Sequence, residues 1–137
     1  MPVDPSLVGR EFPAPAPLSV TPERVTAFAD AVGHPGSGAE AVPPTFPIVL
    51  AFDAMQAFLD AEAIDLHRIV HGEQRFAYAR PLVVGDELTA TLTVSGLRQI
   101  GGADIIATTS EITDASGEVV CTGKATLVHS SGTEGAA

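Results

Sequence analysis

The chain contains no tryptophan, a single cysteine and only seven basic residues among 137. With aromatic residues at 5%, it lacks the stacking platforms that bind single-stranded nucleic acid. The lone Cys121 excludes an internal disulfide and a thiolate metal cluster, and we expect it to be a small core residue. Seventeen acidic residues give a net charge of −10, which disfavours binding to nucleic acid or to an anionic membrane surface.

Long apolar runs are also missing, although 45% of the residues are hydrophobic. No run reaches the roughly 18 residues of a membrane span. The first residues lack the basic and then apolar pattern of a signal peptide, so we expect a cytoplasmic protein. The apolar content is sufficient for one core. We therefore expect one domain over residues 1–129, followed by a disordered tail over 130–137.

A short amphipathic helix is predicted directly after Thr21. Thr21 is a suitable N-cap, and Pro22 suits the first helical position. Gly33 is expected to end the helix. One apolar stripe at helical spacing lies between these signals, at Val25, Phe28, Ala29 and Val32.

A second and longer helix is predicted over residues 46–64, with Thr45 as its N-cap. A helix this apolar must be surrounded by protein, so we expect residues 46–59 to be almost wholly buried against a sheet. One narrow polar stripe interrupts the apolar surface, at Asp53, Gln56 and Asp60.

The remainder of the chain is predicted to form strands. The segment 87–94 alternates apolar and polar residues with a period of two. Further strands are expected over 69–80, 105–113 and 119–128, joined by glycine-containing turns in an antiparallel meander. One long helix wrapped by an antiparallel sheet of about five strands is the α+β hot-dog arrangement. Its exposed edge strands favour a dimer.

Several short motifs resemble those of the MaoC-like hydroxyacyl-thioester dehydratases. They are His71-Gly72-Glu73-Gln74-Arg75-Phe76, Arg80-Pro81-Leu82, Gly85-Asp86 and Val42-Pro43-Pro44-Thr45-Phe46. The likeness covers roughly residues 3–128. It is greatest with the N-terminal type of the family, which includes the non-catalytic small subunit of heterodimeric dehydratases in fatty-acid elongation.

Catalytically complete members of that family carry a Gly-Asp-x-Asn-Pro-x-His run after the first helix, which supplies an Asp and a His. The corresponding stretch here begins Gly33-His34-Pro35 and continues Gly36-Ser37-Gly38, with no Asp after the glycine. The resemblance therefore implies a subunit of fatty-acid or polyketide metabolism that is inactive by itself and needs no cofactor. Its partner would be a second copy or, to complete the active site, a homologue with the intact motif.

The resemblance also implies an acyl-binding role for residues around the central helix and the strand after it. The ligand would be an acyl thioester of coenzyme A or of acyl carrier protein. The candidate binding residues are Thr45, Phe46, Ile48, Phe52, Gly72, Phe76 and Tyr78.

Four residues are weaker catalytic candidates, each with a plainer alternative. His34 is either a relocated base or a solvated loop histidine. His71 and Glu73 are two apart in a predicted strand, so they would share a face as an acid/base pair, or serve a structural role. Asp53 could activate water in a thioesterase, or lie at an interface or in solvent.

The remaining histidines, His67 and His129, are expected at the surface, and the histidine spacing indicates no metal site. Four cations could mark the entrance for a phosphopantetheine arm or be ordinary surface charges: Arg75, Arg80, Arg98 and Lys124. A non-enzymatic acyl-binding or scaffold protein is a third possible function, beside the dehydratase subunit and the thioesterase.

Overall fold

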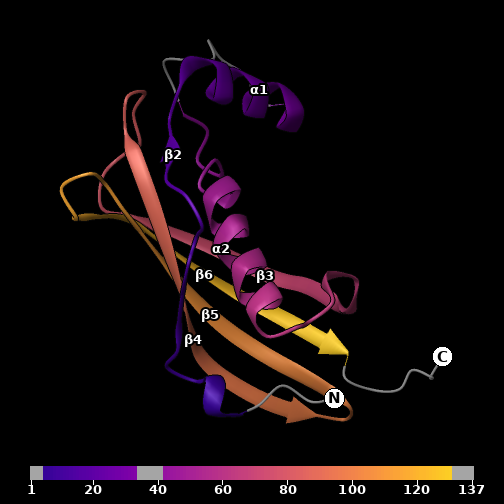
Figure 1. Cartoon of the computed structure of the whole chain (residues 1–137). Coiled ribbons are helices and arrows are strands. Elements are labelled where there is room, and N and C mark those ends of the chain that lie inside the picture. Colours follow the sequence, from indigo (N-terminus) through magenta and orange to yellow (C-terminus); the bar gives the residue numbers. More distant parts are fainter. Residues whose placement is uncertain (1–4, 34–41, 131–137) are drawn as a thin grey trace.

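The computed structural model describes residues 5–33 and 42–130. A six-stranded antiparallel sheet curves around one central helix, α2 (Figure 1). The order of the strands is β1-β4-β5-β6-β3, and β2 also pairs with β4. The elements are η1 (Pro5–Leu7), β1 (Glu11–Pro13), β2 (Leu18–Ser19), α1 (Pro22–Val32), α2 (Ile48–Ala61), η2 (Leu66–Arg68), β3 (Ile69–Tyr78), β4 (Glu87–Ile100), β5 (Ala103–Thr113) and β6 (Val119–Ser130). The expected helix-on-sheet arrangement is confirmed.

The predicted meander covers only the last three strands. β4, β5 and β6 are consecutive neighbours, whereas β3 pairs with β6 at the far edge of the sheet. Residues 79–86 therefore run from one edge of the sheet to β4. The other edge holds the short strands β1 and β2, so β3 is the long edge strand.

Helix α1 follows its sequence signals closely. The Thr21 hydroxyl accepts a hydrogen bond from the Arg24 backbone N–H at 3.1 Å. At the other end Gly33 adopts φ 69°, the left-handed conformation that glycine adopts without strain. Val25 is fully buried, and the Phe28 ring lies edge-on to Phe46 with centroids 5.5 Å apart. Local signals were sufficient here because both caps lie next to the helix in sequence.

The predicted start of α2 is wrong by two residues, and Thr45 is not its N-cap. Regular helix begins at Ile48, and the N-cap position is Pro47, which has no side-chain cap. The Thr45 carbonyl accepts from the Ile48 N–H at 3.0 Å, so Thr45 contributes to a preceding turn through its backbone. The reason is steric: a proline disfavours helical geometry in the residue before it, here Phe46.

The end of α2 is also earlier than residue 64. The helix stops at Ala61, because Ala63 takes the positive φ of 56° and reverses the chain. The Ile64 N–H then bonds the Leu59 carbonyl at 2.8 Å, which satisfies a terminal acceptor.

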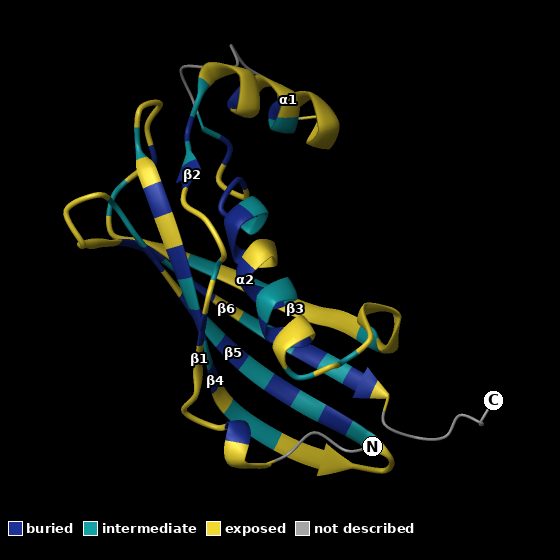
Figure 2. Cartoon of the chain, in the orientation of Figure 1, coloured by how far each residue is buried: buried dark blue, intermediate teal, exposed yellow. Residues whose placement is uncertain are grey.

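Only the sheet-facing side of α2 is buried as predicted (Figure 2). Leu50, Ala54 and Phe58 are at most 1% exposed, whereas Phe52 is 41% exposed and Asp53 is exposed. The expectation that residues 46–59 are almost wholly buried is therefore wrong for the outward side of the helix in the single chain. The Phe58 ring packs against Phe12 of β1 with centroids 5.0 Å apart, which fastens the N-terminal segment over the core.

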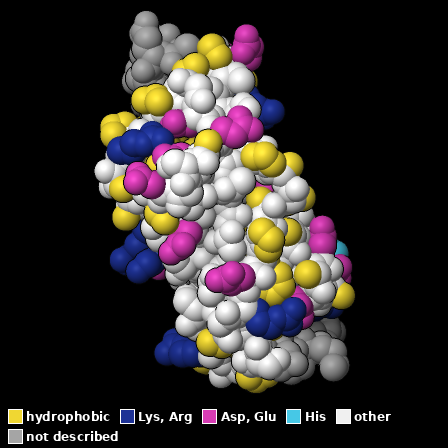
Figure 3. All heavy atoms as spheres, turned by 60° about the vertical axis from the view of Figure 1, so that its left-hand side comes forward, with side chains coloured by type: hydrophobic (Ala, Val, Ile, Leu, Met, Phe, Trp, Pro, Cys, Tyr) yellow, Lys and Arg dark blue, Asp and Glu magenta, His cyan; other side chains and the backbone are white. Residues whose placement is uncertain are grey.

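The two faces of the sheet differ in chemistry. Alternate residues of β4, β5 and β6 face α2, and most of them are apolar and form the core, while threonines recur on the outer face. Four buried polar residues share the inner face: Asp104, Thr108, Ser110 and His129. Acidic and basic side chains are interspersed on the side of the molecule that Figure 3 shows. No helix in the described ranges has the length and apolar character needed to cross a membrane.

Candidate functional site

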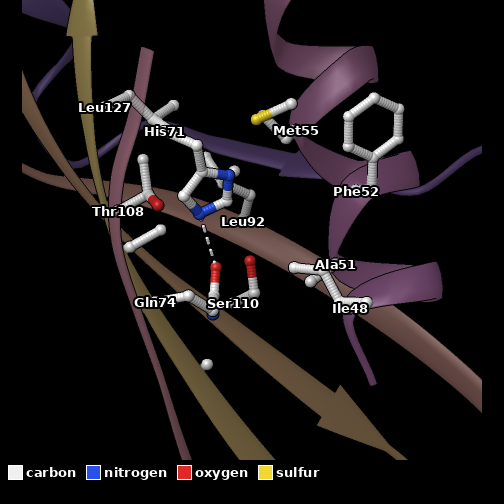
Figure 4. Close-up of a pocket in the computed structure, with 12 residues that line it drawn as sticks. Ile48, Ala51, Phe52, Met55, His71, Gln74, Leu92, Thr108, Ser110 and Leu127 are labelled. Atoms are coloured by element: carbon white, nitrogen blue, oxygen red, sulfur yellow. Dashed lines mark hydrogen bonds between the residues drawn. The ribbon is translucent and has the colours of Figure 1, made fainter. Parts of the chain in front are cut away.

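A small cavity lies between α2 and the inner face of the sheet (Figure 4). Its volume is about 10 Å³, room for about one water molecule. The helix side is entirely apolar, whereas the sheet side carries four polar side chains. The lining residues are Ile48, Ala51, Phe52 and Met55 from α2, and Leu92, Thr108, Ser110, Gly123, Ala125, Leu127, His71 and Gln74 from the sheet.

The cavity exists because two small residues of β6 lie between larger neighbours. Gly123 pairs with Phe76 on β3 and with Ser110 on β5. Ala125 pairs in the same way with Gln74 and Thr108. A Cβ on Gly123 would lie 3.1 Å from the Phe76 ring and 3.2 Å from the Gln74 amide nitrogen, so this ring and this amide lean over the glycine.

His71 and Glu73 do not share a face of the sheet, and their predicted pairing is wrong. A β-bulge between them shifts the register, so that His71 lies opposite Leu127 while Glu73 lies opposite Thr126. Leu127 faces the core and Thr126 faces outward, and cross-strand partners point the same way. In a regular strand, residues two apart point to the same face of the sheet. The extra residue at the bulge reverses this alternation, so His71 and Glu73 point to opposite faces.

The two residues accordingly have separate partners. His71 Nε2 donates to Gln74 Oε1 at 2.9 Å beside the cavity. Glu73 accepts from Arg75 Nε at 2.5 Å on the outer face. No carboxylate is among the described residues that line the cavity.

Ile48 and Phe52 are the two candidate binding residues that line this cavity. Phe46 is 1% exposed and packs on Phe28 in the core, and Thr45 is exposed on the turn before α2. Gly72 lies at the β-bulge. These three were expected at the acyl site on the strength of the family resemblance, and none of them lies on the lining of this cavity.

Phe76 and Tyr78 are on the inner side of β3 but outside the cavity lining. The Tyr78 hydroxyl donates to the Pro44 carbonyl at 2.5 Å, which ties β3 to the segment before α2. Burial, and then the nearby Cys121, raises the pKa of Tyr78 to about 12. Tyr78 also borders an open groove of about 400 Å³ lined by Val42, Pro44 and residues 79–82.

The other catalytic candidates do not reach the cavity. Asp53 is exposed on the outward side of α2, and His34 lies outside the described residues. His129 is 5% exposed, so its predicted surface position is wrong. It faces the inner side of the sheet and bonds Asp104 of β5 at 2.9 Å through Nδ1. This pairing joins residues 25 apart in sequence, which no local pattern indicates.

Arg80 has a structural role, because its guanidinium is held by two carboxylates of the fold. Its guanidinium makes a two-pronged ion pair with Asp86, at 2.9 and 3.0 Å, and reaches Asp114 at 3.4 Å. The hydrogen bond from Arg80 holds the pKa of Asp86 below its usual value. The pKa of Asp114 is also lowered, first by the hydrogen bond from Ser116. The Arg-Pro and Gly-Asp motifs thus join the β3–β4 connection to the β5–β6 turn.

Thr108, Ser110 and Gln74 were missed as site residues. For Thr108 and Ser110 the sequence did contain a usable pattern. Every second residue of the strand 103–113 faces inward, and two of these inward positions carry hydroxyl side chains. Among the described residues, no group of three His, Cys, Asp or Glu side chains could hold a metal ion.

Comparisons with known proteins agree with this architecture. The sequence profile of the FAS1-like dehydratase domain region matches residues 6–123. A UPF0336 protein of Clavibacter michiganensis is 45% identical over an alignment of 143 residues, which covers 93% of this chain and 96% of that protein. The UPF0336 protein SCO4636 of Streptomyces coelicolor is 39% identical and covers 93% of this chain and 95% of its own.

Solved structures give the same result. A chain of the C-terminally truncated HadBC (3R-hydroxyacyl-ACP dehydratase) complex of Mycobacterium tuberculosis is 28% identical, with a TM-score of 0.79 over 93% of this chain and 99% of its own. A MaoC-like dehydratase, 25% identical, has a TM-score of 0.77 over 94% of this chain and 44% of its own. The chain therefore belongs to the FAS1-like dehydratase-domain family and is a hot-dog protein of the MaoC-like hydroxyacyl dehydratase type.

Proposed function

We propose that this chain is the acyl-binding, non-catalytic subunit of a (3R)-hydroxyacyl-thioester dehydratase, acting with a homologous subunit that supplies the catalytic Asp and His. The observation that carries the proposal is the lack of a carboxylate along the described lining of the cavity between α2 and the sheet. The sequence from Gly33 to Thr45 also contains no Asp.

Removing water from a 3-hydroxyacyl thioester needs a base for the proton next to the carbonyl and an acid for the departing hydroxyl. His71 is the one ionisable side chain on the described lining, and its Nε2 is engaged with Gln74. Each acid or base contributes about 10²–10⁴-fold in rate, or about 3–5 kcal/mol of barrier. A chain with a single such group should therefore turn over only at a trace rate.

The edge strand β3 supports pairing with a second chain. It pairs with β6 on one side, and its other edge has no partner among the described residues. Val70 of this strand is 64% exposed, which is unusual for a β-branched apolar residue unless a partner covers it. The similar HadBC chain comes from a complex, which favours a heterodimer, while a homodimer remains the alternative outcome.

The ligand would be an acyl thioester of coenzyme A or of acyl carrier protein, handled in the cytoplasm during fatty-acid metabolism. With a net charge of −10, this chain repels both anionic carriers at long range. The partner subunit would therefore supply the basic surface that receives the carrier.

Hydration of an enoyl thioester tests the proposal. The purified chain should show only trace activity, and addition of a homologue with an intact Gly-Asp-x-Asn-Pro-x-His motif should raise the rate by at least about 10²-fold. Mutating the motif Asp of the homologue should remove the gain, which shows that the partner carries the chemistry. Robust turnover by this chain alone, lost in His71→Ala, would refute the proposal.

The thioesterase alternative has a separate readout. Asp53 lies outside the cavity, and nothing in the described chain brings another catalytic group to it. We expect no thiol release from an acyl-coenzyme A above background. Thiol release that Asp53→Asn eliminates would replace the dehydratase subunit by a thioesterase.

A further inference from the structure

The outer face of the sheet carries an apolar row at one end. Val70 of β3, Val128 of β6 and Ile105 of β5 are direct cross-strand partners, and Arg98 of β4 continues the row. Ile100 lies two residues further along β4. The other outward positions of these strands carry mostly threonine or charged residues. The row therefore departs from the polar pattern that is usual for the water-facing side of an antiparallel sheet.

The apolar side chains of this row are uncovered. Val70 is 64% exposed and Ile100 is 54% exposed, while Ile105 and Val128 are partly exposed. Figure 2 shows the end of β4 and the edge strand β3 as largely exposed. A strand added at the free edge of β3 would touch Val70 from the side and leave the other three open. Single exposed apolar residues are ordinary, whereas adjacent ones on one face indicate an interaction surface.

Two exposed arginines flank the apolar row. Arg98 stands at its β4 end. At its β3 end the Arg68 guanidinium donates to the Ser130 carbonyl at 3.0 Å. Glu73, the next carboxylate along the outer face of β3, is bound to Arg75. The row thus has a cationic rim, on a chain whose net charge is −10.

We propose that this apolar row with its cationic rim docks an acidic amphipathic helix of a partner protein. Neighbouring strands lie about 4.8 Å apart, and helix side chains three or four positions apart lie about 5–6 Å apart. One apolar face of a helix can therefore contact successive residues of the row. Carboxylates beside that face would pair with Arg98 and Arg68. This docking is separate from acyl binding and does not depend on it.

Charge and composition favour this occupant over three others. A second copy would bring two cationic rims together without a carboxylate between them. The residues after Ser130 include no apolar residue larger than alanine, so they are not suited to cover the row. An anionic membrane would face the whole charge of −10. A docked helix would lie next to the rim, within the Debye length of about 8 Å at physiological salt.

Amide NMR shifts of the full chain locate the docking site, with a designed peptide as the probe. The probe is a helix of about 18 residues with leucine on one face and glutamate beside it. It should shift the amides of residues 98–105 and 126–130. A counterpart with lysine in place of glutamate should leave these amides unshifted, because the rim repels it.

Two variants and a matched control separate local contact from general charge. Ile105→Thr/Val128→Thr should weaken binding of the acidic peptide at least about tenfold, because two apolar contacts are lost. Arg98→Glu should weaken it about fivefold, through the loss of one exposed ion pair and the repulsion that replaces it. Lys124→Glu makes the same change in net charge in another row of the outer face. It should leave the affinity within about twofold.

Several results would overturn the proposal. Shifts confined to other residues, or equal effects of Arg98→Glu and Lys124→Glu, would show that the row is not the docking site. Sedimentation that reveals a dimer lost in Ile105→Thr/Val128→Thr would make a second copy the occupant. Binding to phosphatidylglycerol vesicles without peptide binding would make it a membrane. Arg98→Glu keeps the apolar row, so it decides the case even where thermal unfolding shows that the double variant does not fold.

Discussion

Replacing Gly123 by alanine tests whether the hollow between α2 and the sheet depends on that glycine. The new Cβ would lie 3.1 Å from Phe76 Cε1 and 3.2 Å from Gln74 Nε2, where relaxed contacts between carbon atoms are about 3.5–4.0 Å. The Phe76 ring or the Gln74 amide must therefore move by a few tenths of an ångström. Movement of the amide would also disturb its hydrogen bond to His71.

Two opposing effects set the expected magnitude. Overpacking a well-packed site costs about 1–3 kcal/mol. Removing a glycine from a position with ordinary φ stabilises the folded state by about 0.4–1 kcal/mol, through the entropy of the unfolded chain. We therefore expect Gly123→Ala to lower the free energy of unfolding by about 0.5–2 kcal/mol, and to weaken acyl binding.

Denaturant unfolding at constant m-value measures this change. The matched control is Gly96→Ala on β4, whose Cβ would meet only Ala107 at an ordinary 3.6 Å. Gly96→Ala should be neutral or slightly stabilising. If Gly123→Ala proved as stable as Gly96→Ala and bound acyl ligands normally, the glycine would not control the cavity.

Three further changes probe the core, the Arg80 ion pair and the buried thiol. Phe58→Ala should lower the free energy of unfolding by about 3–5 kcal/mol, because the fully buried Phe58 ring packs on Phe12. A loss below about 1 kcal/mol in a denaturant titration would contradict the conclusion that α2 packs its Phe58 side into the core. Asp86→Asn should cost about 1–2 kcal/mol near neutral pH. The folded-state pKa of Asp86 is lowered, so the stabilisation is complete above the unfolded pKa of about 3.9 and is lost as pH falls through the folded pKa. Wild type and Asp86→Asn should therefore converge in acid unfolding curves, and a pH-independent gap would exclude the ion pair as the cause. Burial raises the pKa of the Cys121 thiol to about 11. Alkylation of Cys121 in the native chain near pH 8 should therefore be far slower than in the unfolded chain. Equal alkylation rates would show that the thiol is accessible in the folded protein.

The features that sequence predicted well are those with local causes. Thr21, Pro22 and Gly33 define α1 through contacts within a few residues, and the alternation in 87–94 identifies β4 directly. The start of α2 could have been predicted more closely, because Pro47 restricts Phe46 in a known way. Gly72 inside a strand was likewise a signal for a β-bulge.

The features that sequence missed depend on pairing between distant segments. The burial of His129 follows from its position opposite Asp104, and the cavity follows from Gly123 and Ala125 lying between β3 and β5. Strand order is needed to see either. The order was not predictable from turn signals, because β3 leaves its neighbour in sequence and pairs with β6.

The β-bulge at Gly72 has a consequence for any chain that adds to the edge of the sheet. A regular edge strand can pair with a partner strand in several registers that differ by two residues, because its unpaired backbone N–H and C=O groups repeat every two residues without interruption. In β3 the repeat is interrupted between His71 and Glu73, so an incoming strand finds an unbroken series of backbone donors and acceptors only over residues 73–78. The bulge therefore restricts the register in which a partner strand can pair with β3. It also makes register slippage and the unspecific addition of further chains to this edge unfavourable.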